Sequence, residues 1–305
     1  MNFLGKSIIS MNDFTKEEID FILLKSKEVK ENKWKNTLKG KIIASLFFEP
    51  STRTRLSFET AILKQGGQII GFASSDVSST KKGESLSDSI KNISRYADAI
   101  VMRHYVEGAA RRASEVTTKP IINGGDGANQ HPTQTLLDLF TIKEIKGGME
   151  GLKIGLMGDL KFGRTIHSLL MALSMYNCEI YFISPELLKL PDYYLKYLDM
   201  KNIKYYILND FREISDKLDI LYCTRIQKER FSDPLEYLKV AGSYKITRED
   251  LKYFGDETYL MHPLPRVDEI SPEIDNDKRA IYFDQAENGV FVREAILGLV
   301  LGTIS

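Results

Sequence analysis

The chain has 305 residues, enough for about two domains whose apolar cores need no disulfide or metal support. Its 42 basic and 42 acidic residues balance, so no overall charge favours a nucleic acid or a membrane surface as a partner. No apolar run reaches the roughly 20 residues of a membrane span, no signal peptide is evident, and the two cysteines lack metal or redox spacing, so we expect a cytoplasmic protein with reduced thiols.

The first half of the sequence predicts alternating helices and strands. Thr15 and Glu18 fit a capping box, which predicts a helix over residues 15–30. Short apolar runs predict strands at 42–48, 68–72, 99–102 and 120–123. Apolar residues at helical spacing predict helices at 56–63, from Leu86 to Tyr96, and after His131. This alternation is typical of a parallel α/β layer whose loops lie at one edge.

The second half repeats the pattern. The charged, glycine-containing stretch 143–151 indicates a transition to a second unit, which opens with residues 153–159. A helix is predicted at 165–176, and the last helix at about 290–301. Further strands are predicted at 179–184, 204–208, 219–224, 258–262 and 280–283. We therefore expect two α/β units.

A stretch between the first predicted strand and its helix has the features of a phosphate site. Pro50 keeps Glu49 out of helical geometry and turns the chain. Hydroxyl groups then come near the helix start, where free backbone N–H groups favour an anion; they belong to Ser51, Thr52 and Thr54. Arg53 and Arg55 add planar cationic groups that match phosphate oxygens. The alternative is an ordinary helix cap with solvated arginines.

Other strand ends also carry polar or cationic side chains. They are Arg103 and His104, His131 and Gln134, Arg164, the 225–230 segment, and the proline-rich 262–266 segment. Lys81 and Lys82 lie in a small, polar loop. Each pattern alone is compatible with surface charge, but almost none includes a catalytic carboxylate or nucleophile. Together they indicate a site that binds a small, multiply anionic substrate by position and charge.

Other cofactor patterns are weak or absent. The glycines Gly155, Gly158 and Gly163 do not match the G-x-G-x-x-G spacing, so a tight strand-to-helix turn is preferred over a dinucleotide site. No P-loop occurs, and none of the four histidines is spaced for a metal site. We expect no metal and no cofactor.

Several motifs in register resemble the carbamoyltransferases. The shared motifs are 51–55, 102–104, 131–134 and 262–265. Three more, at 81–84, 158–165 and 224–230, narrow the resemblance to the catalytic chains of the aspartate carbamoyltransferase family. Pro263 follows His262 where the ornithine enzymes have a cysteine. The resemblance extends from Thr15 to the last helix and so covers nearly the whole chain.

The resemblance implies two α/β domains with the active site in the cleft between them. Residues 1–132 with 288–305 would bind carbamoyl phosphate, and residues 133–287 would bind aspartate. The implied carbamoyl phosphate site comprises Ser51, Thr52, Arg53, Thr54, Arg103, His131, Gln134, Leu264 and Pro265. The implied aspartate ligands are Lys82, Arg164, Arg225 and Gln227, with Ser78 or Ser79 from the lysine loop. Glu49, Arg164 and Arg230 resemble residues that form salt bridges on domain closure.

The implied activity is carbamoyl transfer to the α-amino group of L-aspartate, giving N-carbamoyl-L-aspartate and phosphate, an early step of pyrimidine biosynthesis. Arg53, Thr54, Arg103 and His131 would be catalytic. The lysine loop implies a homotrimer in which each active site takes residues from two subunits. Regulatory chains, other bound pathway enzymes and nucleotide control are left open by the sequence. Two other hypotheses remain, an inactive homologue that acts as a binding subunit and a dinucleotide-dependent oxidoreductase.

Overall fold

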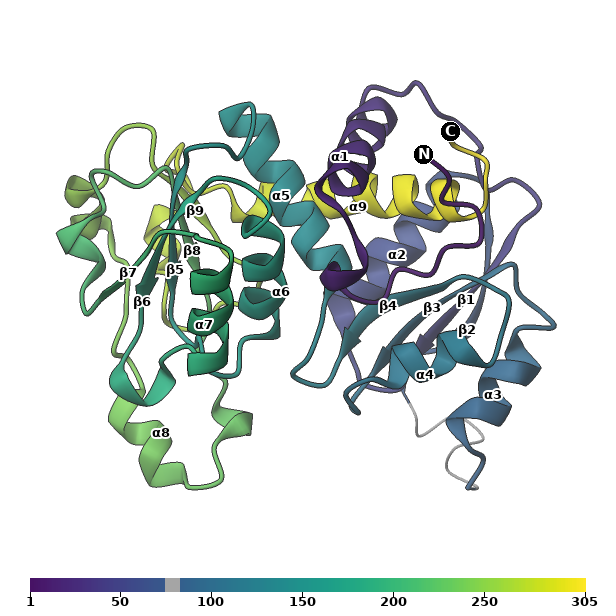
Figure 1. Cartoon of the computed structure of the whole chain (residues 1–305), viewed down its shortest axis with the longest axis horizontal. Helices are drawn as coiled ribbons and strands as arrows, with labels where there is room; N and C mark the ends of the chain where they lie inside the picture. The colour runs from purple at the N-terminus through teal and green to yellow at the C-terminus, as the bar shows by residue number, and fades with distance from the viewer. Residues whose placement is uncertain (75–82) are drawn as a thin grey trace. The chain divides into compact units, whose positions relative to one another are not determined.

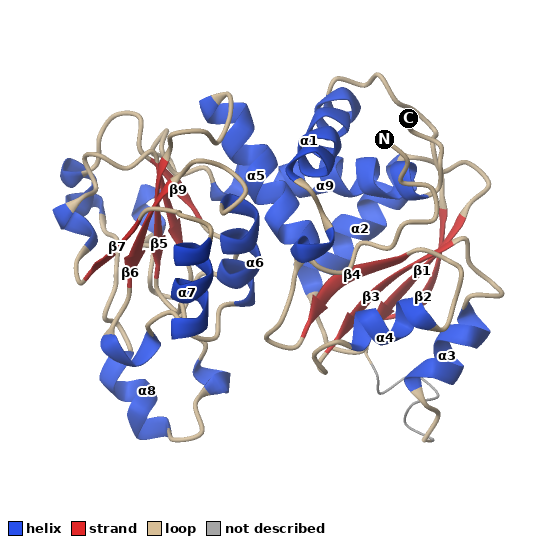
Figure 2. Ribbon diagram, viewed as in Figure 1, coloured by secondary structure: helices blue, strands red, loops and turns tan. Residues whose placement is uncertain are grey.

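The computed structural model describes residues 1–74 and 83–305. They form two compact units, Met1–Phe140 with Glu287–Ser305, and Thr141–Ala286 (Figure 1). Each unit is built on one parallel sheet with flanking helices, which confirms the predicted fold class (Figure 2). Ser78, Ser79, Lys81 and Lys82 lie outside the described residues. Within the described ranges, no helix combines the length and the apolar character needed to cross a bilayer.

The first unit contains a four-stranded sheet of order β2-β1-β3-β4, with every strand pair parallel. Its strands are β1 (Ile42–Phe47), β2 (Gln68–Phe72), β3 (Ala99–His104) and β4 (Ile121–Asp126). Alternate residues of β1 and β3, such as Leu46 and Met102, pack against α3 (Leu86–Ile93) and α4 (Ala109–Glu115). Because helices cover both faces, β3 is buried along its whole length (Figure 2).

The remaining long helices of this unit were all predicted, although α9 begins at Tyr282 and not near the predicted Val290. Helix α1 (Lys16–Lys30) begins after Thr15, whose side chain and Glu18 form the predicted capping box. Helix α2 (Thr52–Lys64) follows β1 directly. Helix α9 (Tyr282–Val300) packs on α2, where Arg293 donates to the Ser57 hydroxyl at 2.9 Å. The division between the two units falls within α5 (Pro132–Lys146).

The second unit contains a five-stranded parallel sheet of order β7-β6-β5-β8-β9. Its strands are β5 (Lys153–Met157), β6 (Glu179–Ile183), β7 (Tyr205–Leu208), β8 (Ile220–Cys223) and β9 (Tyr259–Met261). Its helices include α6 (Arg164–Leu173), α7 (Asp192–Met200) and α8 (Pro234–Val240). The central strand β5 lies next to β6 and β8, so the loops after β5 and β8 emerge side by side.

Some predicted elements were wrong. Residues 280–283 do not form a strand, since only Ala280 bridges to Leu260 and α9 then begins at Tyr282. The Gln285 N–H donates to the Ile281 carbonyl at 2.8 Å, so helical bonding starts at once. Tyr96 lies beyond α3 and is exposed. The sequence reasoning also missed α4, α7 and α8, because short helices carry little periodic signal.

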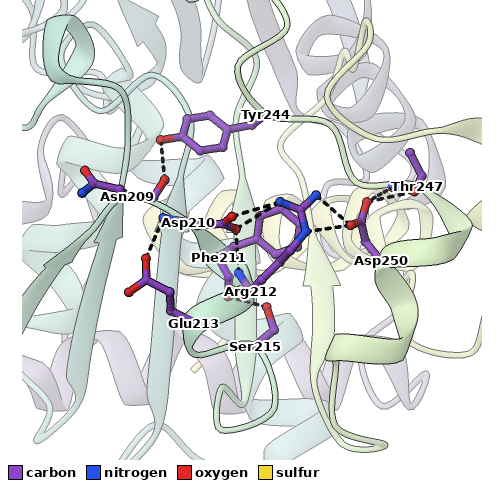
Figure 3. Close-up of polar contacts among 9 residues, drawn as sticks. All are labelled: Asn209, Asp210, Phe211, Arg212, Glu213, Ser215, Tyr244, Thr247 and Asp250. Carbon is purple, nitrogen blue, oxygen red and sulfur yellow. Dashed lines mark hydrogen bonds and ion pairs between the residues drawn. The ribbon is translucent and has the colours of Figure 1, made fainter.

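An ion-pair network joins two segments of the second unit (Figure 3). Arg212 donates to one carboxylate oxygen of Asp250 from Nε and Nη2, at 3.0 and 2.8 Å, and to Asp210 from Nη1 at 3.0 Å. The other Asp250 oxygen accepts from the Thr247 backbone and hydroxyl, both at 2.9 Å. Burial alone would raise the pKa of Asp250, but the hydrogen bonds from Thr247 and Arg212 hold it below its ordinary value.

We expect Arg212→Met to destabilise the second unit by about 1–3 kcal/mol at pH 7, because it leaves the buried Asp250 carboxylate without its cation. Because the pKa of Asp250 is lower in the folded protein than in the unfolded chain, the ionised carboxylate stabilises the fold at pH values above the unfolded pKa. This contribution is lost as the pH falls through the folded pKa. The difference between wild type and variant should therefore shrink on acidification. Urea unfolding at neutral and acidic pH measures it. Lys189→Met, which breaks the exposed Glu186 pair, should cost under about 1 kcal/mol, and equal losses in both variants would contradict the prediction.

Candidate active site

The predicted phosphate loop leads into the first turn of α2. Ser51 is the N-cap residue, and Thr52 and Arg53 are the first two helical residues. Both Thr52 and Arg53 are exposed, whereas Thr54 is buried. The first backbone N–H groups of a helix lack intrahelical acceptors and form the positive end of its dipole. Hydroxyl groups, N–H groups and one arginine therefore share a single helical turn.

Thr54, Arg103 and His131 gather around a pair of glycines in β4. A Cβ atom at Gly125 would lie 3.0 Å from Arg103 Nη1 and 3.5 Å from His131 Cδ2, and one at Gly124 would lie 3.5 Å from Thr54 Cγ2. Thr54 Oγ1 and His131 Nε2 are themselves 3.5 Å apart. Gly125 also has a φ of +116°, which side chains rarely adopt. Glycine is therefore required where the strand passes between these side chains.

Arg103 is a buried cation that contacts a carboxylate and a backbone carbonyl group. Its side chain is 10% exposed, Nη2 lies 3.0 Å from Glu49 Oε2, and Nη1 donates to the Gly124 carbonyl at 3.3 Å. Glu49, predicted to form salt bridges on domain closure, thus pairs with Arg103 here. The neighbouring His104 has a structural contact instead, since its Nδ1 accepts from the Val106 N–H at 2.9 Å. Arg103 is held in place by protein acceptors on two sides.

The side chain of Gln134 is oriented by a residue that sequence reasoning missed. Gln134 Nε2 donates to Asp138 Oδ1 at 2.9 Å, and Asp138 is fully buried. Because the amide nitrogen is turned toward Asp138, its oxygen remains to accept a donor elsewhere. The four-residue spacing on α5 was a usable signal, since such residues are neighbours on a helix.

In the second unit, Asp159 links the loops that follow β5 and β8. Its buried carboxylate accepts from the Phe162 N–H at 2.9 Å and from the Gln227 N–H at 3.2 Å. Burial raises the pKa of Asp159, and these hydrogen bonds oppose the shift. The preceding Gly158 has a φ of +112°, and a Cβ there would lie 2.2 Å from the Thr224 carbonyl oxygen. Sequence reasoning gave Asp159 no role, although it lies within a recognised motif.

The predicted aspartate ligands lie on these two loops. Arg164 is the first residue of α6, and Gln227 Nε2 donates to the Phe162 carbonyl at 3.0 Å. Arg225 is half-buried and binds both carboxylate oxygens of Glu229. That hydrogen-bonded pairing raises the pKa of Arg225. Arg225 thus binds a carboxylate in a bidentate manner in this structure.

Leu264 and Pro265 follow β9 in an unusual backbone conformation. Leu264 has a φ of +54°, which costs a non-glycine residue roughly 1–2 kcal/mol, and its peptide bond to Pro265 is cis. The Leu264 N–H donates to His262 Nδ1 at 2.8 Å, and proline has no N–H. The backbone groups that these residues can offer a ligand are therefore carbonyl acceptors.

The structure thus brings the predicted residues together in two sets. The first unit holds Ser51, Thr52, Arg53, Thr54, Arg103, His131 and Gln134. The second unit holds Arg164, Arg225, Gln227, Leu264 and Pro265. Ser78 and Lys82 lie outside the described residues. Each set lies at the carboxyl ends of its parallel strands, where open α/β sheets bind ligands.

Comparison with known proteins matches each of the two sets of residues to a different family model. Residues 6–144 match the family model for the carbamoyl-P binding domain of aspartate/ornithine carbamoyltransferase, and residues 150–300 match the Asp/Orn binding domain. The aspartate carbamoyltransferase catalytic subunit of Thermococcus kodakarensis is 54% identical, covering 100% of this chain and 99% of that protein.

Solved structures give the same result. The catalytic subunit of M. jannaschii aspartate transcarbamoylase is 53% identical with a TM-score of 0.91, covering 97% of this chain and 98% of the other. The Trypanosoma cruzi aspartate transcarbamoylase, solved with carbamoyl phosphate and aspartate, is 37% identical with a TM-score of 0.91, covering 98% of each chain.

Proposed function

Because the chain belongs to the aspartate/ornithine carbamoyltransferase family, we propose that it transfers the carbamoyl group of carbamoyl phosphate to the α-amino group of L-aspartate. The products are N-carbamoyl-L-aspartate and phosphate. The observation that carries this proposal is the gathering of Thr54, Arg103 and His131 around Gly124 and Gly125, which concentrates polar donors at one point of the first unit. The aspartate-specific names of the relatives support the choice of acceptor.

Carbamoyl phosphate is proposed to bind through its three chemically distinct parts. The phosphate would lie at the first turn of α2, with Ser51, Thr52 and Arg53. The carbonyl oxygen would accept from Thr54, Arg103 and His131. The amide group is a donor, and it suits acceptors: the oxygen of Gln134, which Asp138 leaves available, and the carbonyl groups of Leu264 and Pro265.

Aspartate is proposed to bind through its two carboxylates. Arg164 and Arg225 supply cationic groups, Gln227 supplies an amide, and Lys82 supplies a further charge. Arg225 already binds a carboxylate bidentately, that of Glu229. Because Asp159 accepts hydrogen bonds from the backbone of both loops, it would fix the position of Arg164 relative to Arg225 and Gln227.

The chemistry then follows from the charges. The uncharged α-amino nitrogen attacks the carbamoyl carbon and forms a tetrahedral intermediate with negative charge on its oxygen. The donors of Thr54, Arg103 and His131 stabilise that charge, and losing one such donor typically costs on the order of 10²–10³ in rate. The C–O bond to phosphate then breaks, Arg53 stabilises the leaving group, and phosphate accepts the proton that nitrogen loses. This route needs no protein general base.

We further propose a homotrimer in which Lys82 of one subunit completes the active site of its neighbour. The name catalytic subunit, carried by the relatives, is compatible with assembly into a larger enzyme. An inactive binding subunit is the other hypothesis, and the presence of Arg53, His131, Lys82 and Arg225 argues against it.

The proposed activity is tested with carbamoyl phosphate and either aspartate or ornithine as acceptor, measuring the ureido product. We expect product with aspartate and none with ornithine. Product with ornithine would contradict the choice of acceptor that rests on Pro263 and Lys82. Absence of product with both acceptors would favour the inactive subunit. A reaction without enzyme corrects for the spontaneous reaction of carbamoyl phosphate.

A further inference from the structure

A buried hydrogen-bonded pair, His262 and Glu269, lies directly beside the Leu264–Pro265 backbone, and the mechanism above does not use it. His262 Nε2 and Glu269 Oε1 are 2.6 Å apart, and the side chains are 1% and 7% exposed. His262 follows β9, and Glu269 lies at the far end of the same loop. Because the two residues lie at opposite ends of this loop, their contact can determine the conformation of the backbone between them.

The hydrogen bonds determine which nitrogen of His262 carries the proton. The Leu264 N–H donates to Nδ1 at 2.8 Å, so Nδ1 must be the acceptor and Nε2 must donate to Glu269. Protonation of Nδ1 would place two donors against each other. The His262 backbone N–H also donates to the Gln285 side chain at 2.9 Å. The imidazole is therefore held in one tautomer and orientation.

Both carboxylate oxygens of Glu269 are used. While Oε1 accepts from His262, Oε2 accepts from the backbone N–H groups of Val267 and Asp268, each at 3.1 Å. Burial alone would raise the pKa of Glu269, but these hydrogen bonds hold it below its ordinary value. The carboxylate thus connects the imidazole on one side with the loop backbone on the other.

Leu264 needs such support because its φ of +54° is unfavourable for a branched side chain. A backbone conformation of this kind persists only where its surroundings hold it, and such residues concentrate at functional sites. We propose that His262 and Glu269 are positioning residues, which hold Leu264 in this conformation and so place the Leu264 and Pro265 carbonyl groups for carbamoyl phosphate. The inference rests on the proposed function, to which it adds two residues.

Two substitutions of His262 separate positioning from general stability. In His262→Asn, the side-chain oxygen can take the place of Nδ1 and accept from Leu264, while the contact with Glu269 is lost. In His262→Gln, the amide can reach Glu269 while the Leu264 N–H loses its acceptor. We expect the Gln variant to raise the KM and the Kd for carbamoyl phosphate on the order of 10-fold, with a smaller change in kcat. The Asn variant, which keeps an acceptor for Leu264 but loses the contact with Glu269, should show a smaller, several-fold loss of affinity.

Glu269→Gln is the second test, which carries the inference if His262→Gln does not fold. Glutamine has one acceptor oxygen, so an amide donor would face either His262 or the Val267 and Asp268 N–H groups. Its affinity for carbamoyl phosphate should fall several-fold. Ser215→Ala is the matched control, because it removes a buried hydrogen bond of the same unit, from Ser215 to the Phe211 carbonyl. It should lower the melting temperature and leave the KM unchanged.

The outcomes are distinct. Unchanged carbamoyl phosphate binding in folded His262→Gln or Glu269→Gln would overturn the inference. Equal losses of binding in the Asn and Gln variants would also overturn it, because they would indicate a purely structural role. Carbamoyl phosphate binding is measured without aspartate. If the wild-type chain bound carbamoyl phosphate but formed no product, the proposed function would fail while the positioning test could still be read.

Discussion

Arg53→Ala is expected to abolish turnover while the fold stays intact. Arg53 is exposed on the first turn of α2, so its truncation leaves no cavity in the core. Its guanidinium is proposed to stabilise the leaving phosphate, and each hydrogen bond to a charged group contributes about 1.5–3 kcal/mol. Two such bonds that strengthen as phosphate leaves correspond to a fall in kcat on the order of 10³.

The controls for Arg53→Ala separate the lost charge from the lost geometry. Arg53→Lys keeps the charge but cannot bind two oxygens in a planar fork, so we expect activity between those of wild type and Arg53→Ala. Arg112→Ala removes an exposed arginine that pairs with Glu115 on α4, and it should leave kcat unchanged. Steady-state kinetics and thermal unfolding are measured together. Near-normal kcat in a folded Arg53→Ala protein would refute the assignment of the phosphate site.

Mixing two inactive variants is expected to restore activity. Arg53→Ala subunits lack a group that acts in their own site, whereas Lys82→Ala subunits lack a group proposed to act in a neighbour's site. In a cyclic trimer, about three quarters of random assemblies are mixed, and each mixed trimer contains one complete site out of three. Recovery should therefore approach about a quarter of the wild-type activity in the unsorted mixture and about a third in purified mixed trimers, starting from two preparations that are each inactive.

The complementation experiment depends on verified subunit exchange. Differently tagged variants are unfolded together, refolded, and purified by both tags in sequence, and ureido product formation is then measured. Mixing the folded variants without exchange is the control and should give no activity. Mixed trimers without activity would contradict shared sites, whereas a monomeric wild-type protein would contradict the trimer itself.

The sequence by itself determined those features that depend on neighbouring residues. The capping box of α1 and the strand β2 were predicted because a few adjacent side chains set the local backbone. The loop proposed to bind phosphate was recognisable as a candidate for the same reason, since Pro50, three hydroxyl residues and Arg53 are adjacent in sequence. The order of its motifs along the chain indicated the family, which the comparisons confirmed.

Only the tertiary structure decided features that depend on contacts between distant segments. Residues 280–283 have a strand-like composition, yet they lead into α9 at Tyr282. The Ile281 carbonyl accepts from Gln285, and Tyr282 is buried in the core of the second unit. Gly125 must be a glycine because a side chain there would meet Arg103 and His131. The residues next to Gly125 in the sequence do not reveal these contacts. Asp159 likewise depends on a loop 68 residues away. The role of a buried polar group depends on its hydrogen-bond partners, which can be distant in the sequence. A single sequence does not show which distant residues form these hydrogen bonds.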